Sequence, residues 1–348
     1  MPAEPLTTTP GVPTSAALAR RALGLVALLA VLALVISVLP GLDDVRARFS
    51  RADPVWIAVT FACAFASTLS YVAALRGTLS RQIPWRASWN LGMAEQGSNV
   101  LLPTGGIGGP ALGAVVLRRA GVPIDVAAPR SAALFLLTSA TSFAVIALAG
   151  IAVGVGLLPG DVSWVGTLLP AALAVVVMCA VAALGRLPVG DGAKGGGRAA
   201  RWRRQGAALL RDGVQESRSL LRTHDPLLIA GCVGYLAFSI AAVGAAFQAF
   251  GGGGPPIGMF LLAYTLGQVG SLIPTPGGLG GTEGGLIGMF VVYGAPAAPA
   301  AAAVLLYRVF QLGLPTLFGL LAFRQIRRRL ADEEETAAVA ARFEADPP

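Results

Sequence analysis

Long apolar runs recur along this chain, and they restrict its fold more than any other feature of the sequence. A helix needs about 20 predominantly apolar residues to cross the hydrocarbon core of a membrane. Only 13% of the residues are charged, against roughly 25% in a soluble globular domain, so polar groups are too few to cover a surface in water. The sequence therefore predicts an all-α integral membrane protein with about six spanning helices, at residues 22–39, 54–75, 129–153, 164–184, 226–250 and 297–323.

These runs lie within a predicted transmembrane domain at residues 19–329, and we expect disorder at the two polar ends, residues 1–18 and 330–348. The first run could instead be a secretory signal. It is longer than the apolar core of about 7–15 residues found in such signals, so we interpret it as a retained helix. Residues 185–225 form a basic loop, in which apolar side chains recur at helical spacing among arginines over residues 198–222. We expect an amphipathic helix there, either on the inner membrane face or in a soluble cytoplasmic loop.

Two further apolar stretches are each interrupted by prolines and glycines. At 1.5 Å per residue, the segment 89–102 reaches roughly 21 Å along a helix, while the hydrocarbon core is about 30 Å thick. Each stretch is therefore either one kinked crossing or a re-entrant hairpin that returns to its own side. The first comprises residues 89–102, a break at 103–110 and residues 111–117, and the second comprises residues 257–273, a break at 274–281 and residues 284–293.

The positions of the arginines favour hairpins. If each break lay in a kinked crossing, with the N-terminus inside, the basic loop at residues 185–225 would face outward, against the excess of Arg and Lys in cytoplasmic loops. With two re-entrant hairpins, both termini and this loop face the cytoplasm, and only the basic residues Arg46, Arg48 and Arg51 face outward. We therefore predict two re-entrant helical hairpins that enter from opposite sides. The similar segments 101–109 and 272–281 then suggest an inverted-topology repeat.

The two breaks form the candidate binding site. Irregular backbone at membrane depth must be buried in protein or line a cavity, and glycine-rich breaks direct amide donors and helix N-termini toward that cavity. Such a site suits an anionic group, for example a lipid phosphate. Alternatively, these residues only permit tight helix packing, as the four-residue spacing of Gly280, Gly284 and Gly288 suggests. The candidate substrate-binding residues in the breaks are Pro103, Gly105, Gly106, Gly108, Pro274, Pro276, Gly277, Gly278 and Gly280.

Two charged residues join this candidate site. Arg308 lies near the middle of the last apolar run, where an arginine costs roughly 2.5–3.5 kcal/mol to insert, so it should face the bundle interior or a wet cavity. Glu283 follows the second break and could pair with Arg308, which would offset the desolvation of both. The pair could also be a purely structural lock. The secondary candidates are Glu95, Asn99, Gln268, Tyr307 and Gln311.

Other kinds of site find no support in the sequence. The three cysteines, Cys63, Cys179 and Cys232, lie singly within apolar runs, and there is one histidine, so we expect neither a metal nor a cofactor. The net charge of +8 arises from residues at the ends of apolar runs, which does not indicate nucleic-acid binding. Phosphate-loop, zinc-helix and nucleophile-elbow motifs are absent from the sequence.

These residues resemble the lysylphosphatidylglycerol synthase transmembrane-region family of flippase-like membrane proteins, over roughly residues 22–329. The most specific part is the segment 274–280 followed by Glu283, Gly294 and Arg308, and the segments 51–56 and 118–123 are also similar. Many members carry a Gly-Glu pair and a nearby arginine after the first break. Here the matching positions are Gly109-Pro110 and Gly113, so no charged role carries over to that break.

The resemblance implies a stand-alone lipid-flippase-like module, because the aminoacyl-transferase domain of full-length synthases is missing. We expect it to move an anionic phospholipid or a polyprenyl-phosphate-linked lipid between the leaflets of a bacterial cytoplasmic membrane. One alternative is a membrane glycosyl- or acyltransferase that uses Asp43, Asp44 or Glu283. Another is a non-catalytic scaffold for cell-envelope enzymes. Membrane lipid is the expected partner, and the sequence indicates no oligomeric state.

Overall fold

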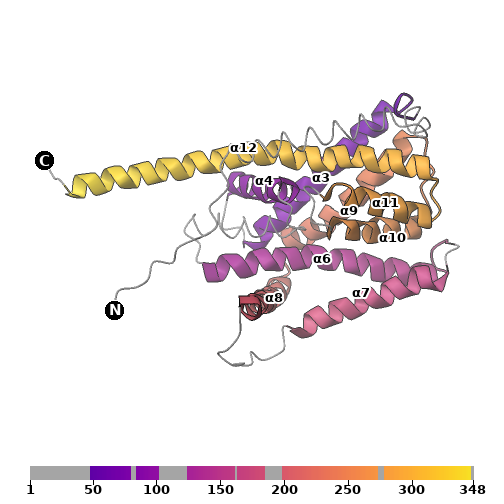
Figure 1. Cartoon of the computed structure of the whole chain (residues 1–348), viewed down its shortest axis with the longest axis horizontal. Helices are drawn as coiled ribbons and strands as arrows, with labels where there is room; N and C mark the ends of the chain where they lie inside the picture. Colours follow the sequence, from indigo (N-terminus) through magenta and orange to yellow (C-terminus); the bar gives the residue numbers. More distant parts are fainter. Residues whose placement is uncertain are drawn as a thin grey trace.

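The computed structural model describes residues 48–79, 84–101, 124–160, 163–184, 198–272 and 278–345, and this part of the chain contains helices and no β-strand. Five of its helices contain stretches long and apolar enough to cross a membrane (Figure 1). They are α3 (Pro54–Thr78), α6 (Ile124–Gly154), α7 (Trp164–Leu184), α9 (Pro226–Ala249) and α12 (Ala297–Ala345). Five of the six predicted spans are thus confirmed, and the sixth, residues 22–39, lies outside the described residues.

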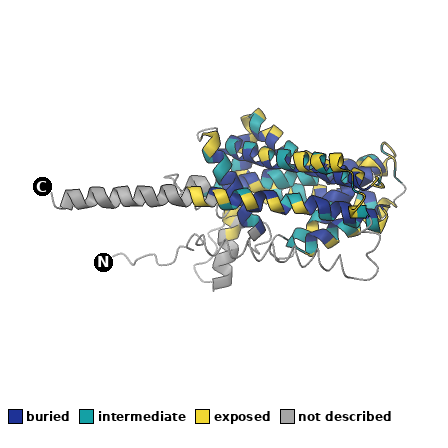
Figure 2. Ribbon diagram, turned by 90° about the horizontal axis from the view of Figure 1, so that it is seen from above, coloured by how far each residue is buried: buried dark blue, intermediate teal, exposed yellow. Residues whose placement is uncertain are grey.

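The outer faces of these helices are apolar, whereas buried residues concentrate inside the bundle (Figure 2). On α7, Leu173 and Val176 are each 61% exposed, and on α6 Leu148 is 69% exposed. Large apolar patches on a surface that faced water would be a liability for solubility. On a surface that faces lipid they are the expected composition. The protein is therefore an all-α, multi-pass membrane protein.

An aspartate followed by a proline begins both α3 and α9. The Asp53 side chain accepts a hydrogen bond from the Val55 amide, and the Asp225 side chain accepts one from the Leu227 amide, each at 2.8 Å. Such N-caps satisfy free amides of the first turn, and proline is favoured at the first helical position because its missing N–H needs no partner there. The same local sequence thus starts two helices that belong to different halves of the chain.

Helices α3 and α9 pack antiparallel along most of their length. The Asp53 amide donates to the Ala249 carbonyl at 2.9 Å, so α3 begins where α9 ends. At the other end, a Cβ on Gly77 would lie 2.8 Å from the backbone of Leu228. Small residues permit this approach, as is common where helices associate in membranes.

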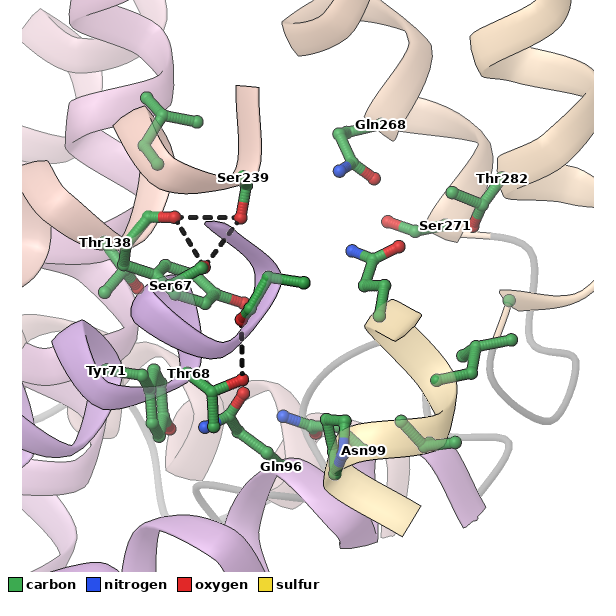
Figure 3. A pocket seen from close by; sticks show the side chains of 18 of the residues that line it. Ser67, Thr68, Tyr71, Gln96, Asn99, Thr138, Ser239, Gln268, Ser271 and Thr282 are labelled. Carbon is green, nitrogen blue, oxygen red and sulfur yellow. Dashed lines mark hydrogen bonds between the residues drawn. The ribbon is translucent and has the colours of Figure 1, made fainter. Parts of the chain in front are cut away.

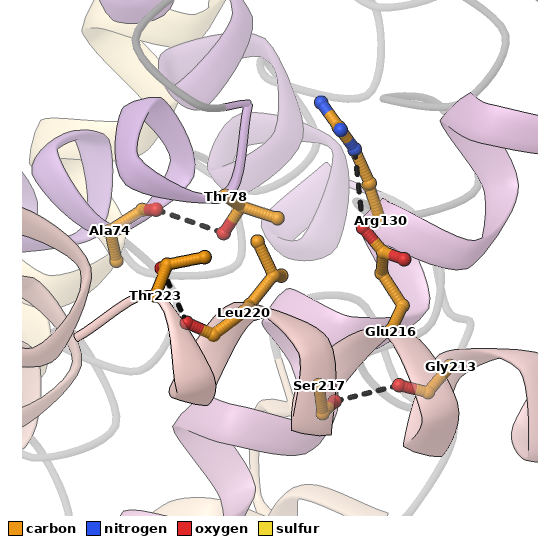
Figure 4. A network of polar contacts seen from close by, with 8 residues as sticks. All are labelled: Ala74, Thr78, Arg130, Gly213, Glu216, Ser217, Leu220 and Thr223. Carbon is orange, nitrogen blue, oxygen red and sulfur yellow. Dashed lines mark hydrogen bonds and ion pairs between the residues drawn. The ribbon is translucent and has the colours of Figure 1, made fainter. Parts of the chain in front are cut away.

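The helix α8 (Arg198–Arg222) confirms the predicted amphipathic segment and lies against the beginning of α6. Ser217 donates to the carbonyl of Gly213, and Arg130 of α6 pairs with Glu216 at 3.3 Å (Figure 4). Its side chain Leu220 joins a buried cluster with Leu79 and Leu228. One end of the bundle, the α8 end, therefore contains α8, the end of α3 and the starts of α6 and α9.

Two short apolar helices form a hairpin at the opposite end. They are α10 (Ile257–Gly267), extended by the 3-10 helix η1 (Gln268–Leu272), and α11 (Gly281–Val292). A Cβ on Gly258, at the start of α10, would overlap Val153 near the end of α6, and the Tyr293 hydroxyl after α11 donates to Gly166 of α7 at 2.6 Å. The hairpin thus begins and ends at the same end of the bundle, which we name the α10 end.

The glycines that allow this hairpin to close are not the ones that the four-residue spacing suggested. A Cβ on Gly280, Gly284 or Gly288 would meet no described atom within 4 Å. By contrast, a Cβ on Gly285 would overlap the carbonyl oxygen of Gly267, and one on Gly270 would overlap that of Gly281. Close packing between α10 and α11 therefore depends on other glycines, because what matters is the backbone lying opposite rather than the spacing within one helix.

The helix α4 (Trp85–Leu101) enters the bundle from the α8 end. Its first residue, Trp85, stacks under the guanidinium of Arg76 at 4.7 Å, and Gly97 would place a Cβ 2.9 Å from the Pro315 carbonyl oxygen of α12. Helix α4 follows α3 as α10 follows α9, and α3 and α9 are antiparallel. This is the arrangement that an inverted-topology repeat predicts. The first predicted break and its return segment lie at residues 102–123, outside the described residues.

The last helix is longer than the sequence predicted. Helix α12 continues to Ala345, through most of the acidic and alanine-rich residues for which we expected disorder, and projects beyond the bundle in Figure 1. Alanine and glutamate are strong helix formers. Extending an existing helix also avoids the cost of a new nucleus, so these residues can continue α12.

Candidate functional site

A cavity of about 360 Å³ lies between helices from both halves of the chain. Helix α4 reaches it from the α8 end, and α10 with η1 reaches it from the α10 end. Helices α3, α6, α9, α11 and α12 complete its sides (Figure 3). Its lining is unusually polar for the interior of a membrane bundle. Hydroxyl groups come from Ser67, Thr68, Tyr71, Thr138, Ser139, Ser142, Tyr235, Ser239, Tyr264, Ser271, Thr282 and Tyr307, and amides come from Gln96, Asn99, Gln268 and Gln311.

Most of the candidate residues that the structure describes line this cavity. Its lining includes the predicted residues Asn99, Gln268, Gly278, Tyr307, Arg308 and Gln311. Glu95, Glu283 and Gly280 are not among the lining residues. The other candidates in the two breaks lie outside the described residues: Pro103, Gly105, Gly106, Gly108, Pro274, Pro276 and Gly277.

Glu283 and Arg308 form the predicted pair. The guanidinium Nε of Arg308 donates to Oε1 of Glu283 at 2.7 Å, and the two residues are only 5% and 6% exposed. The other oxygen, Oε2, accepts a hydrogen bond from the Gly280 amide at 2.7 Å, and Gly280 itself has a φ of +83°, which favours glycine. Because both carboxylate oxygens are occupied, Glu283 orients Arg308 and the start of α11 and is poorly placed to act as a general base.

A chain of hydrogen bonds links η1, α10 and α12 along one side of the cavity. Nε2 of Gln268 donates to the Tyr264 hydroxyl at 2.8 Å, and the hydroxyls of Tyr264 and Tyr307 are 2.9 Å apart. Arg308 continues this surface, with its Nη1 donating to Oε1 of Gln311 at 2.8 Å. Since each side chain is held by a neighbour on another turn or helix, this side of the cavity is preorganised.

The hydroxyl side chains of α3, α6 and α9 were not predicted as site residues from the sequence. Ser67 and Ser239 lie 2.8 Å apart across the α3–α9 contact, and Ser67 also donates to the Tyr235 carbonyl. Their signal in the sequence is weak, because single serines and threonines occur in many spanning helices, where they bond to the preceding turn. A better signal was the segment 138–142 of α6, which places two threonines and two serines in five residues of an apolar span.

Glu95 lies beside the cavity and is 1% exposed. The Tyr71 hydroxyl donates to its Oε2 at 2.9 Å, while its Oε1 has no partner among the described residues. Burying a carboxyl oxygen without a partner costs free energy. The single hydrogen bond from Tyr71 therefore contributes much of the stabilisation of the Glu95 side chain.

Replacing Tyr71 with phenylalanine should lower the free energy of unfolding by about 1–3 kcal/mol, because Oε2 of Glu95 then loses its partner and neither carboxyl oxygen has one among the described residues. Unfolding in detergent micelles, followed by tryptophan fluorescence, measures the change. Tyr235→Phe is the control, since the centroid of this ring lies 5.4 Å from that of Tyr71 and no hydrogen bond of its hydroxyl is found among the described residues. Equal losses in the two variants would contradict the assignment.

Among the described residues, no group of three or more His, Cys, Asp or Glu side chains could hold a metal ion. The described lining of the cavity offers hydroxyls, amides and one guanidinium, which is hydrogen-bonded to a carboxylate. Such a set can bind and orient a polar group through hydrogen bonds.

The sequence matches the family described as the lysylphosphatidylglycerol synthase TM region over residues 21–319. The match includes both predicted breaks, every described residue that lines the cavity, and the Glu283–Arg308 pair. No curated protein matches the chain. Since the match covers most of the sequence, the chain belongs to the lysylphosphatidylglycerol synthase transmembrane-region family.

Proposed function

We propose that this protein translocates a membrane lipid between leaflets, an anionic phospholipid or a polyprenyl-phosphate-linked lipid, and that the cavity receives the headgroup. The observation that carries the proposal is the polar cavity inside an apolar bundle, approached by α4 from one end and by α10 from the other. A lipid headgroup that crosses the hydrocarbon core needs such a polar environment, because its own polar groups lose their water.

The distribution of charge supports an orientation of this bundle. Arg76, Arg130 and the arginine-rich α8 lie at the α8 end, whereas Arg48 and Arg51 precede α3 at the α10 end. Cytoplasmic loops carry the excess of arginine. We place the α8 end and both termini in the cytoplasm of a bacterial cell, with the α10–α11 hairpin re-entering from outside and α4 beginning a hairpin from inside.

Reconstitution into liposomes tests this proposal. Purified protein should accelerate the exchange of fluorescent phosphatidylglycerol between leaflets, measured by the fraction that a membrane-impermeant quencher reaches. Ser142→Trp places a bulky ring in the cavity lining and should return the exchange rate to that of protein-free liposomes.

Leu148→Trp is the matched control, because Leu148 lies on the same helix, α6, but is 69% exposed on its outer face. This variant should exchange lipid as fast as the unchanged protein. If both tryptophan variants behave alike, or if no anionic lipid is exchanged by the unchanged protein, the cavity is not a translocation site.

A further inference from the structure

The sides of the cavity differ in what they offer to a ligand. On one side lies the hydroxyl wall, which we define as Ser67, Thr68, Tyr71, Thr138 and Ser239, from α3, α6 and α9 (Figure 3). The proton of each of these hydroxyls has an acceptor within the protein. Thr68 donates to the Ala64 carbonyl and Thr138 to the Leu134 carbonyl. A hydroxyl whose proton is used still carries lone pairs, so this wall presents hydrogen-bond acceptors to the cavity.

Donors without a described partner lie elsewhere in the lining. Nε2 of Gln96, on α4, is buried and has no hydrogen-bond partner among the described residues, and Gln96 is 8% exposed. The hydroxyl of Thr282, on α11, is also buried and has no hydrogen-bond partner among the described residues. Buried polar groups are nearly always bonded in native proteins. A ligand that accepts a hydrogen bond from Gln96 and donates hydrogen bonds to the hydroxyl wall would give partners to both the donor and the acceptors.

Charge narrows the class of ligand further. The described lining residues include one cationic side chain, Arg308, which Glu283 already binds, and they include no Asp or Glu. A cationic group would therefore meet no carboxylate in this lining. A phosphate could accept hydrogen bonds from Gln96 and Thr282 but would offer the hydroxyl wall no donor. A hydroxylated group fits both walls, since each of its hydroxyls donates one bond and accepts others.

We propose that the cavity recognises an uncharged polyhydroxylated ring, a sugar or a cyclitol, carried by the headgroup of the translocated lipid. This inference rests on the proposed function and specifies its substrate class. The size agrees, because about 360 Å³ corresponds to roughly a dozen water volumes of about 30 Å³ each, enough for a hexose of about twelve heavy atoms.

A pair of lipids that differ only by a sugar tests the inference. The full chain is reconstituted in phosphatidylcholine nanodiscs that contain monoglucosyl diacylglycerol, diacylglycerol or phosphatidic acid with the same acyl chains. The unfolding temperature is then measured as a function of the content of the added lipid. Monoglucosyl diacylglycerol should raise this temperature in a saturable way, whereas the other two should not. Stabilisation by phosphatidic acid without stabilisation by the glucolipid overturns the inference.

Two variants test whether the glucolipid stabilises the protein by binding in the cavity. Gln96→Met removes the unpartnered donor and should weaken binding of the glucolipid about tenfold, the loss of one hydrogen bond of typical strength. The fold should remain intact, because no described contact of Nε2 is lost. Thr316→Val is the matched control, since its hydroxyl is equally buried and unpartnered but lies outside the lining. Equal affinities in all three proteins would overturn the inference.

The same proteins separate this inference from the proposed function. Exchange of phosphatidylglycerol without binding of the glucolipid keeps translocation and rejects the polyhydroxylated ligand. Stabilisation by free glucose, with no exchange of any lipid, keeps the polyhydroxylated ligand and assigns it to a soluble source, which rejects lipid translocation. Stabilisation by the glucolipid but not by free glucose supports both.

Discussion

Replacing Arg308 with methionine should lower the free energy of unfolding by about 3–5 kcal/mol, the usual cost of removing one partner from a buried ion pair. The loss arises because the carboxylate of Glu283, which is 6% exposed, no longer has the guanidinium that compensates it. Substituting Glu283 by glutamine in the same chain should restore most of the stability. The amide has no charge to desolvate, and its oxygen can still accept the bond from the Gly280 amide.

Unfolding of the two single variants and the double variant, in one detergent, gives the coupling energy of the pair. Arg211→Met is the control, because the Arg211–Asp212 pair is partly exposed and should change stability by about 1 kcal/mol or less. A double variant that loses the full sum of the single losses would show that the two charges do not depend on each other.

The double variant also separates a structural lock from a role in transport. If the pair is only a lock, the refolded double variant should exchange lipid at the unchanged rate in liposomes. If Arg308 contacts the headgroup, exchange should stay low although the fold has recovered. The lining position of Arg308 favours the second outcome.

Gly231→Leu should be the second severe substitution, with a loss of about 3 kcal/mol, the upper part of the usual range for overpacking. A Cβ at this position of α9 would already lie 2.7 Å from the Ala74 Cα and 2.8 Å from the Ser70 carbonyl oxygen of α3. Backbone atoms cannot rotate away, so the two helices must separate. Packing of this kind is a main source of stability between helices in a membrane.

Gly288→Leu on α11 is the matched control, because a Cβ there meets no described atom within 4 Å. Its effect should be near zero or slightly stabilising, since leucine is the better helix former by up to about 1 kcal/mol. Both variants are compared by denaturant titration in the same micelles. A loss in Gly288→Leu as large as that in Gly231→Leu would contradict the α3–α9 contact as the cause.

The sequence by itself determined the membrane class, the five described spanning helices, the amphipathic helix α8 and one interaction in the site. Spanning helices can be identified from sequence because the bilayer demands about 20 apolar residues in succession, a property of the chain in one dimension. The Glu283–Arg308 pair was predictable for a similar reason. Two opposite charges in apolar segments each need a partner, and few others are available. The break and return segment of the first predicted hairpin, and most of the second break, lie outside the described residues, so their predicted roles stay predictions.

Only the tertiary structure decided which small and polar residues meet. Gly285 is a packing glycine and Gly288 is not, because the carbonyl of Gly267 lies opposite the first and no described atom lies opposite the second. The cavity likewise depends on Ser67 and Ser239, which are 172 positions apart in the chain and 2.8 Å apart in the fold. A serine in an apolar helix can bond to its own backbone wherever it points, so the sequence alone does not reveal whether it faces lipid, a neighbouring helix or a site. That direction is set by helix rotation and crossing, which the packing of the whole bundle determines.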